Sequence, residues 1–421
     1  MKQDARPGDY VEIHRDKEIY EGVLLEAPVS EKGIILLKLD NGYNIGFNKK
    51  DVREIKLVEK AVEEKENFKV EQIKGKPAIG FVVTGGTIAS KLDPKTGAVK
   101  WLESPETLFK FYPEIFEVAN VVKVEVPFLK GSENLDFKDW QKLAKVVGEM
   151  VNNENIKGVI VTHGTDTLHY TASALSFFLR GLTKPVVLTY SQRSIDRASS
   201  DAQLNLKCAA IAALSDIAEV MIVGHATASD DYCYALRATK TRKMHSSRRD
   251  AFKSVNIKPF AKINEDGLEI IGKYNLRSKG KVKVDLKFEE KVALLKFYPG
   301  QSPDILDYYL KKGYKGIVIE AFGLGQIATK EARLSWTNKL KEVVKKGLVV
   351  CMTAQTIYGQ LNPNVYSTGR ELADTGVIYL KDMLSETAFI KLGWVLGHKN
   401  WNVKEKMLEN FSGEFNSRLE E

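Results

Sequence analysis

Three short segments of the sequence combine hydroxyl, carboxylate and amine side chains that could support acyl transfer. Thr87 ends the run TGGT, Thr165 and Asp166 lie within 162–167 (THGTDT), and Lys240 lies in the run ATKT. A threonine hydroxyl becomes a nucleophile when a base takes its proton and a further group orients that base. We interpret Thr87 as a candidate nucleophile and Thr165 as a relay. Lys240 would then be the base, oriented by Asp166.

Each segment alone also has a purely structural interpretation. Threonine and aspartate are favoured at helix N-termini, and paired glycines are typical of tight turns. The lysine also carries a cost, because keeping it neutral near pH 7 means lowering its pKa by about 3 units, or about 4 kcal/mol. Burial could supply that shift, although ionised Asp166 would oppose it. It is the combination of the three segments that favours an enzyme.

Strands must position these segments, and the surrounding pattern predicts them. Ala78–Val83 (AIGFVV) and the run KGVIVT each lead directly into one of the candidate turns, and a helix is expected over 136–152. Strands that alternate with amphipathic helices indicate an α/β fold with parallel sheets. Such sheets bind ligands at the carboxyl ends of their strands, which is where the candidate residues fall.

The chain divides into four parts by pattern. Short apolar runs broken by glycine predict a small all-β barrel of SH3 or Tudor type over residues 1–58, and a charged stretch over 59–76 reads as a linker. An α/β domain that carries the catalytic residues is expected over 77–290. The strand and helix alternation starts again near residue 291, so we predict a second α/β domain over 291–421.

Composition excludes several classes of protein. The 421 residues are 43% hydrophobic and 28% charged, which excludes disorder as the main state. No window approaches the roughly 18 apolar residues of a membrane span, so we expect a soluble cytoplasmic protein without membrane contact. The cysteines are far apart, which argues against a disulfide framework or a paired-cysteine zinc site. They are Cys208, Cys233 and Cys351.

Two further groups of residues invite a functional interpretation but have a simpler one. His163 and His169 flank the THGTDT turn without cysteine or carboxylate at ligand spacing, so we interpret them as packing or capping groups and expect no metal. A basic run could contact RNA phosphate, or it could be a solvated loop beside the active site. This run contains Arg242, Lys243, His245, Arg248 and Arg249.

The segments TGGTIAS and THGTDTLHYTASAL resemble the two signature segments of the bacterial-type L-asparaginase/glutaminase superfamily. The resemblance extends through Ser132–Leu135 and Thr239-Lys240 to VYSTGRELADTGVI near the C-terminus. The segments KLDNGYNIGF, SQRSIDR and RKMHSSRRDAF further resemble the D-subunit family of archaeal glutamyl-tRNA(Gln) amidotransferases. In that family an asparaginase-like two-domain body carries a small β-barrel extension, so the match covers the whole chain.

The resemblance implies a role for each matching residue. Thr87 matches the usual nucleophile of the family, and the second catalytic set is matched by Thr165, Asp166 and Lys240. Which of the two threonines attacks is left open. Ser132 matches the residue that holds the substrate α-carboxylate.

The α-amino group of the substrate would be held by Asp166 with help from Glu133, where stand-alone asparaginases commonly have glutamine. The loop 88–101 departs from many asparaginases because it has no tyrosine. We therefore hypothesise an active site that is completed only when a partner binds.

The resemblance also implies an activity and partners. The chain would hydrolyse glutamine and supply ammonia to the E subunit of the amidotransferase, which amidates glutamate carried on tRNA. No cofactor is expected in this chain, and ATP and Mg would be used by the complex through the partner. A homodimer core within a heterotetramer is expected, with tRNA bound mainly by the partner. The alternatives are a stand-alone cytoplasmic L-asparaginase and, less favoured, a non-enzymatic amino-acid sensor or RNA-binding module.

Overall fold

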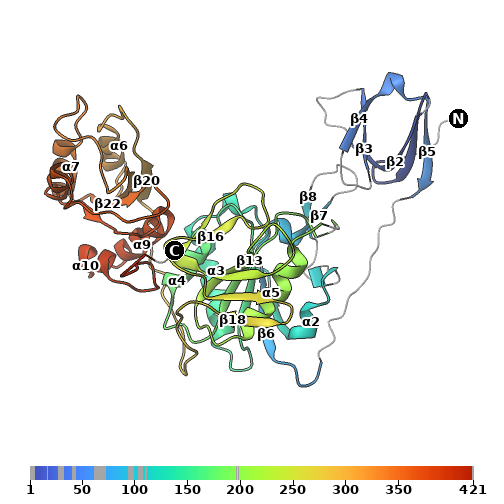
Figure 1. Cartoon of the computed structure of the whole chain (residues 1–421), viewed down its shortest axis with the longest axis horizontal. Helices are drawn as coiled ribbons and strands as arrows, with labels where there is room; N and C mark the ends of the chain where they lie inside the picture. Colours follow the sequence, from blue (N-terminus) through green and yellow to red (C-terminus); the bar gives the residue numbers. More distant parts are fainter. Residues whose placement is uncertain are drawn as a thin grey trace.

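The structure is a computed structural model, and three sheets of four or more strands dominate it (Figure 1). No helix in the part of the chain that the structure describes is long and apolar enough to cross a membrane. The described residues are 5–16, 18–26, 33–39, 44–60, 73–92, 99–102, 108–109, 111–195, 197 and 199–419.

The N-terminal sheet is antiparallel throughout, in the order β4-β3-β2-β1-β5. Its core contains Val11, Ile13, Leu37 and Phe47, which alternate with more exposed neighbours along each strand as expected for a sheet with one buried face. The predicted small all-β domain is confirmed. Residues 61–72 of the predicted linker lie outside the described residues. The strands are β1 (Tyr10–Arg15), β2 (Glu18–Leu25), β3 (Ile34–Lys38), β4 (Asn44–Asn48) and β5 (Glu54–Glu59), with a 3-10 turn, η1 (Lys49–Asp51), before β5.

The largest sheet has eight strands in the order β18-β17-β14-β13-β12-β10-β6-β9. The last five in that order run parallel, as predicted, whereas β14, β17 and β18 pair antiparallel. Residues 261–270 form the β17–β18 hairpin at the edge of this sheet. The strands are β6 (Ala78–Val83), β9 (Asn120–Glu125), β10 (Val159–Thr162), β12 (Val186–Thr189), β13 (Val220–His225), β14 (Cys233–Arg237), β17 (Ala261–Asn264) and β18 (Gly267–Ile270).

Helices cover both faces of this sheet because its central strands are apolar on both sides. In β10, Val159 and Val161 pack with α3 and α4, and Ile160 packs with α5 on the opposite face. The predicted helix over 136–152 is confirmed as α3, and Asp136 caps it by accepting hydrogen bonds from the amides of residues 138 and 139. The helices are α2 (Ile115–Val118), α3 (Phe137–Val151), α4 (Leu168–Phe178) and α5 (Ala202–Leu214).

The third sheet is parallel, in the order β20-β21-β22-β23, and belongs to the C-terminal part of the chain. Its strands are β20 (Val292–Lys296), β21 (Gly316–Ala321), β22 (Val349–Ala354) and β23 (Ile378–Tyr379). Its helices are α6 (Ile305–Lys311), α7 (Thr337–Lys345), α8 (Ser367–Ala373), α9 (Ser385–Leu396) and α10 (Val403–Leu408).

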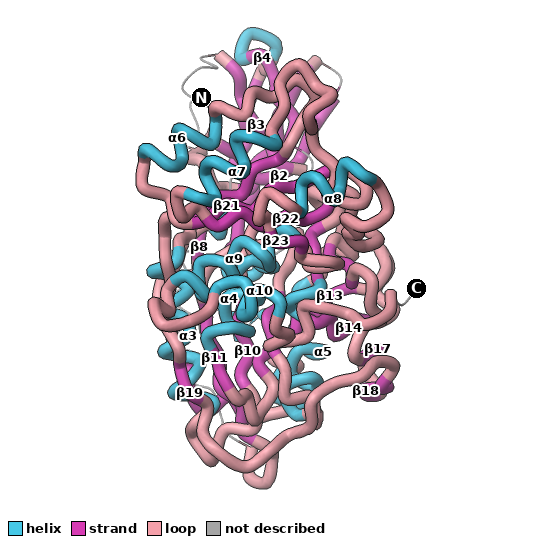
Figure 2. Tube along the Cα trace, turned by 90° about the vertical axis from the view of Figure 1, so that its left-hand side faces the viewer, coloured by secondary structure: helices cyan, strands magenta, loops and turns pink. Residues whose placement is uncertain are grey.

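Helix α9 joins the two α/β bodies, since it packs against both α4 and β21 (Figure 2). The ring of Trp394 on α9 stacks on Phe177 of α4 with ring centroids 5.4 Å apart. One apolar core therefore runs from the first α/β body into the second. Three two-stranded ribbons complete the described fold: β7 (Ser90–Leu92) with β8 (Val99–Trp101), β11 (Leu179–Arg180) with β19 (Lys283–Val284), and β15 (Thr241–Lys243) with β16 (Phe252–Ser254).

Candidate active site

The turns that carry Thr87 and Thr165 touch each other at the carboxyl ends of two neighbouring parallel strands. Strand β6 leads into the 3-10 turn η2 (Thr87–Ala89), and β10 leads into the turn at 163–167. Gly86 has a φ of +82°, and a Cβ placed on it would lie only 2.4 Å from Gly164 Cα. Glycine is therefore required at this contact, both for the positive φ and for the close approach of the two backbones.

A third turn, η3 (Ser132–Asn134), joins them and brings Ser132 to the same edge of the sheet. The Thr167 amide donates to Ser132 Oγ over 3.4 Å, and the Thr167 hydroxyl donates to the Ser132 carbonyl over 2.7 Å. Ser132 is buried, and the neighbouring Glu133 is exposed. Ser132 therefore lies against the 162–167 turn. In the loop 88–101, residues 93–98 lie outside the described residues.

The amine that completes the group belongs to Lys243, which ends β15. Its Nζ lies 2.8 Å from Thr165 Oγ1 and 2.8 Å from Asp166 Oδ1, so the ammonium donates to both. The Lys243 side chain is 12% exposed, whereas that of Asp166 is 63% exposed. A hydroxyl, a carboxylate and an amine therefore meet at one point with access from solvent. Sequence reasoning missed this role for Lys243, which appeared there only as part of the basic run.

Lys240, the predicted base, lies elsewhere. It ends the 3-10 turn η4 (Ala238–Lys240), is fully buried, and donates from Nζ to Asp382 Oδ2 and to the Asp382 carbonyl, each over 2.7 Å. Burial lowers the pKa of Lys240, and the charge of Asp382 opposes that shift. The predicted contact of Lys240 with Thr165 and Asp166 is wrong, because its ammonium is committed to the second α/β body.

The error arises because two lysines, Lys240 and Lys243, lie only three positions apart. Lys240 ends the 3-10 turn η4, whereas Lys243 ends the strand β15, and their ammonium groups reach Asp382 and Thr165 respectively. Lys240 and Lys243 both follow β14 within one short stretch, and motif spacing alone does not tell which of them turns toward Thr165. The available signal was a second lysine at the start of RKMHSSRRDAF.

The two histidines that flank the turn are buried and neutral at pH 7. Burial lowers the pKa of His163 to about 4 and that of His169 to about 3. His163 Nδ1 lies 2.7 Å from the Gly164 carbonyl, and His169 packs beside the ring of Tyr170. These are the surroundings of packing groups. Among the described residues, no group of three or more His, Cys, Asp or Glu could hold a metal ion.

Much of the basic run is engaged in ion pairs. Arg242 Nη2 lies 3.2 Å from Glu386 Oε1, and burial raises the pKa of Glu386 while Arg242 opposes that shift. Arg248 pairs with Asp250, and Arg249 pairs with Asp230. All three arginines therefore have an acidic partner within the chain, although the Arg248 side chain remains 54% exposed.

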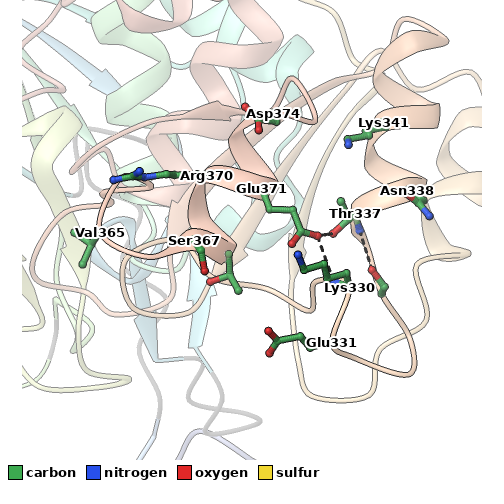
Figure 3. Close-up of a pocket in the computed structure, with 12 residues that line it drawn as sticks. Lys330, Glu331, Thr337, Asn338, Lys341, Val365, Ser367, Arg370, Glu371 and Asp374 are labelled. Carbon is green, nitrogen blue, oxygen red and sulfur yellow. Dashed lines mark hydrogen bonds between the residues drawn. The ribbon is translucent and has the colours of Figure 1, made fainter.

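A large hollow on the described surface lies away from this group of residues. It has a volume of about 920 Å³, lies between α7 and α8, and is lined by none of the predicted site residues (Figure 3). Its carboxylate Glu371 already accepts from the Thr337 hydroxyl over 2.6 Å and from the Lys330 amide. We therefore place the candidate active site at the Thr165–Asp166–Lys243 contact and not in this hollow.

Comparison with protein families matches three successive parts of the chain. A family described as "Asparaginase, N-terminal" matches residues 78–275, and one described as "Glutaminase/Asparaginase C-terminal domain" matches 291–407. A third, described as "GatD N-terminal domain", matches 5–58. These matches cover both α/β bodies and the small β domain.

Curated relatives match almost the whole chain. A protein of Pyrococcus furiosus, named as the D subunit of glutamyl-tRNA(Gln) amidotransferase, is 50% identical over 97% of this chain and 94% of its own length. A protein of the same name from Sulfurisphaera tokodaii is 42% identical over 98% of this chain and 92% of its own length. Among solved structures, the thermostable L-asparaginase from Thermococcus kodakarensis has a TM-score of 0.72 and 28% identity, covering 80% of this chain and 99% of that one.

Proposed function

The chain belongs to the D-subunit family of glutamyl-tRNA(Gln) amidotransferases, and we propose that it is the glutaminase of such a complex. It hydrolyses glutamine to glutamate and ammonia, and the ammonia is used to convert Glu-tRNA(Gln) to Gln-tRNA(Gln). The observation that carries this proposal is the Lys243 ammonium, 2.8 Å from both the Thr165 hydroxyl and the Asp166 carboxylate. This is the arrangement of base, relay and orienting acid that a threonine nucleophile needs.

The reaction is acyl transfer in two steps. The Lys243 ammonium of the resting site first gives one proton to solvent. Thr87 Oγ1 then attacks the side-chain carbonyl carbon of glutamine, and its proton passes through Thr165 to the Lys243 amine. The C–N bond then breaks, and ammonia leaves with the proton that Lys243 returns. Water attacks the resulting ester, releases glutamate and restores the Thr87 hydroxyl. Lys243 replaces Lys240 in the role of base that the sequence suggested.

We assign substrate recognition to the loop that follows β9 and to Asp166 in the turn that follows β10. Ser132 would hold the α-carboxylate of glutamine, while Asp166 and Glu133 would hold the α-amino group. The exposure of Asp166 and Glu133 supports this assignment, because both carboxylates are open to a ligand from solvent. Glutamine carries a negative α-carboxylate and a positive α-amino group. Binding these two groups to different side chains would fix the orientation of the substrate.

Assembly follows from the same proposal. The chain would work in the cytoplasm with the E subunit of the amidotransferase, as a homodimer core within a heterotetramer. The partner would use ATP and Mg and bind most of the tRNA.

We also propose the four-part division at residues 58, 76 and 290, in which the small β domain is a docking or structural module rather than an RNA-binding one.

Hydrolysis measured with and without the partner tests these assignments. The chain is assayed with glutamine and with asparagine, alone and together with the partner and glutamylated tRNA. We expect glutamine turnover that rises when partner and tRNA are added. Strong asparagine turnover by the chain alone would favour the stand-alone asparaginase, and no hydrolysis under any condition would favour the sensor.

A pair of lysine variants tests the site itself. Lys243→Met should lower the kcat for glutamine by about 10²- to 10⁴-fold, the usual contribution of a general base. Lys253→Met is the matched control, since Lys253 stands on the same hairpin but donates to Asp250 and to the Ala226 carbonyl. A wild-type rate in Lys243→Met would overturn the assignment.

A further inference from the structure

Lys243 stands on a very small element. Strands β15 and β16 form a hairpin with three residue pairs, and in the described part of the chain neither strand joins one of the larger sheets. A two-stranded hairpin is at best marginally stable by itself. Contacts outside the hairpin must therefore help to fix the distance between Lys243 and Thr165.

The second α/β body supplies such contacts from the start of this segment. The Thr239 hydroxyl donates to the Ser412 carbonyl over 2.9 Å. The Thr387 hydroxyl, on α9, donates to the Thr239 carbonyl over 2.9 Å. Residue 239 is thus tied through its side chain and through its backbone to elements that lie more than 140 residues away in the chain.

Two ion pairs also join this segment to the second α/β body. Lys240 pairs with Asp382 over 2.7 Å, both side chains being fully buried, and Arg242 pairs with Glu386 over 3.2 Å, with Glu386 only 7% exposed. Asp382 is itself oriented, because the Asn416 amide donates to its other oxygen over 3.2 Å. Removing one partner of a fully buried pair leaves an uncompensated charge, so Asp382 restricts Lys240 to one position, and Glu386 holds the partly exposed Arg242 by the same attraction.

The geometry of an extended strand converts this restraint into an orientation of Lys243. Successive side chains of β15 point to opposite sides. Arg242 reaches Glu386 in the second body, so the next residue, Lys243, is turned back toward Thr165 and Asp166. Attachment at residues 239, 240 and 242 therefore holds both the place and the direction of the Lys243 side chain.

Resting on the proposed function, we propose that Asp382 and Glu386 are positioning residues for glutamine hydrolysis. They act through Lys240 and Arg242 to keep the Lys243 amine within hydrogen-bond distance of Thr165. Their loss should slow the step that uses Lys243. It should change substrate binding less than the chemical step, because Ser132 and Glu133 make none of these contacts and only Asp166 touches Lys243.

Two isosteric variants test the proposal in the full-length chain assembled with its partner. Asp382→Asn and Glu386→Gln should each lower the kcat for glutamine by about 10- to 100-fold, the usual effect of misplacing a catalytic group by about 1 Å. KM should change by no more than about twofold, since an interaction that acts only on the chemical step changes kcat. Arg242 is the residue that pairs with Glu386. Arg242→Lys should retain more activity than Arg242→Met, because lysine keeps the positive charge.

The control variant lowers the stability of the second α/β body at a residue that does not contact the β15–β16 hairpin. Leu340 is fully buried in the core of the second body itself, and Leu340→Ala should lower Tm while keeping kcat at temperatures well below that Tm. Asp382→Asn and Glu386→Gln variants that behave like Leu340→Ala would overturn the positioning role. Should Asp382→Asn fail to fold, the Arg242 pair of variants decides, because that side chain is 27% exposed and tolerates substitution better.

The same assays separate this proposal from the one it rests on. Wild-type hydrolysis by Lys243→Met would remove the proposed active site altogether. An inactive Lys243→Met beside a fully active Glu386→Gln and Arg242→Met would leave the active site in place and overturn only the positioning role.

Discussion

Lys240 and Asp382 form a fully buried ion pair of 2.7 Å that joins the first α/β body to the second. Breaking one side of such a pair leaves an uncompensated charge, so Asp382→Leu should lower the free energy of unfolding by about 3–5 kcal/mol. The double variant Lys240→Met/Asp382→Leu should recover most of that loss, because two apolar side chains need no partner charge. Urea unfolding of the single and double variants measures both values. A double variant no more stable than Asp382→Leu would contradict this account.

The nucleophile can be identified by covalent labelling. A diazoketone analogue of glutamine should alkylate Thr87, because attack on the substrate carbonyl is assigned to that hydroxyl. Mass spectrometry of the digested protein locates the label, and Thr87→Ala should abolish it. A label on Thr165 would reverse the roles of the two threonines while leaving Lys243 as the base.

Ser132 should affect binding more than chemistry. Ser132→Ala removes a hydroxyl that is assigned to the substrate carboxylate, and a hydrogen bond to a charged group contributes about 1.5–3 kcal/mol. We therefore expect KM for glutamine to rise about 10- to 100-fold with a smaller change in kcat. Steady-state kinetics with glutamine gives both constants, and an unchanged KM would remove Ser132 from the binding site.

The buried histidines should make the fold sensitive to acid. Both are uncharged in the folded chain because burial lowers the pKa from 6.5 to about 4 for His163 and to about 3 for His169. Below pH 6.5 the unfolded chain binds protons that the folded chain does not, so stability falls as the pH drops from 6.5 toward 4. Each histidine should cost about 3 kcal/mol across that range.

Unfolding free energies measured from about pH 7 to about pH 4 check this expectation. His169→Phe fits the aromatic surroundings of Tyr170 and Phe252, and it should remove its share of the acid sensitivity. A variant whose stability falls with acid as steeply as that of the wild type would assign the effect to other groups.

The sheets were predictable because their signals are local. Strand β6 has the bounds read from AIGFVV, and α3 differs by one residue at each end from the helix expected over 136–152. Apolar runs and helical spacing report burial directly, so these elements need no knowledge of their neighbours. The antiparallel strands β14, β17 and β18 were harder, since pairing depends on contacts that sequence order does not state.

The candidate site was predictable in part. The touching turns at Gly86 and Gly164 follow from glycines that permit close approach of two backbones. The identity of the amine was not predictable from spacing, because Lys240 and Lys243 both follow β14 within a few residues, one at the end of a 3-10 turn and the other at the end of a strand. Asp382 decides between them by fixing Lys240, and it lies 142 residues further along the chain.

That distance along the chain has a consequence for synthesis. The ribosome releases the two threonine turns and the hairpin of Lys243 long before it releases Asp382, Glu386 and Ser412. A nascent or truncated chain that ends before these residues lacks the anchors of the hairpin and should not turn over glutamine. Ammonia production would then begin only in finished molecules, which limits waste of the amide donor by incomplete translation products.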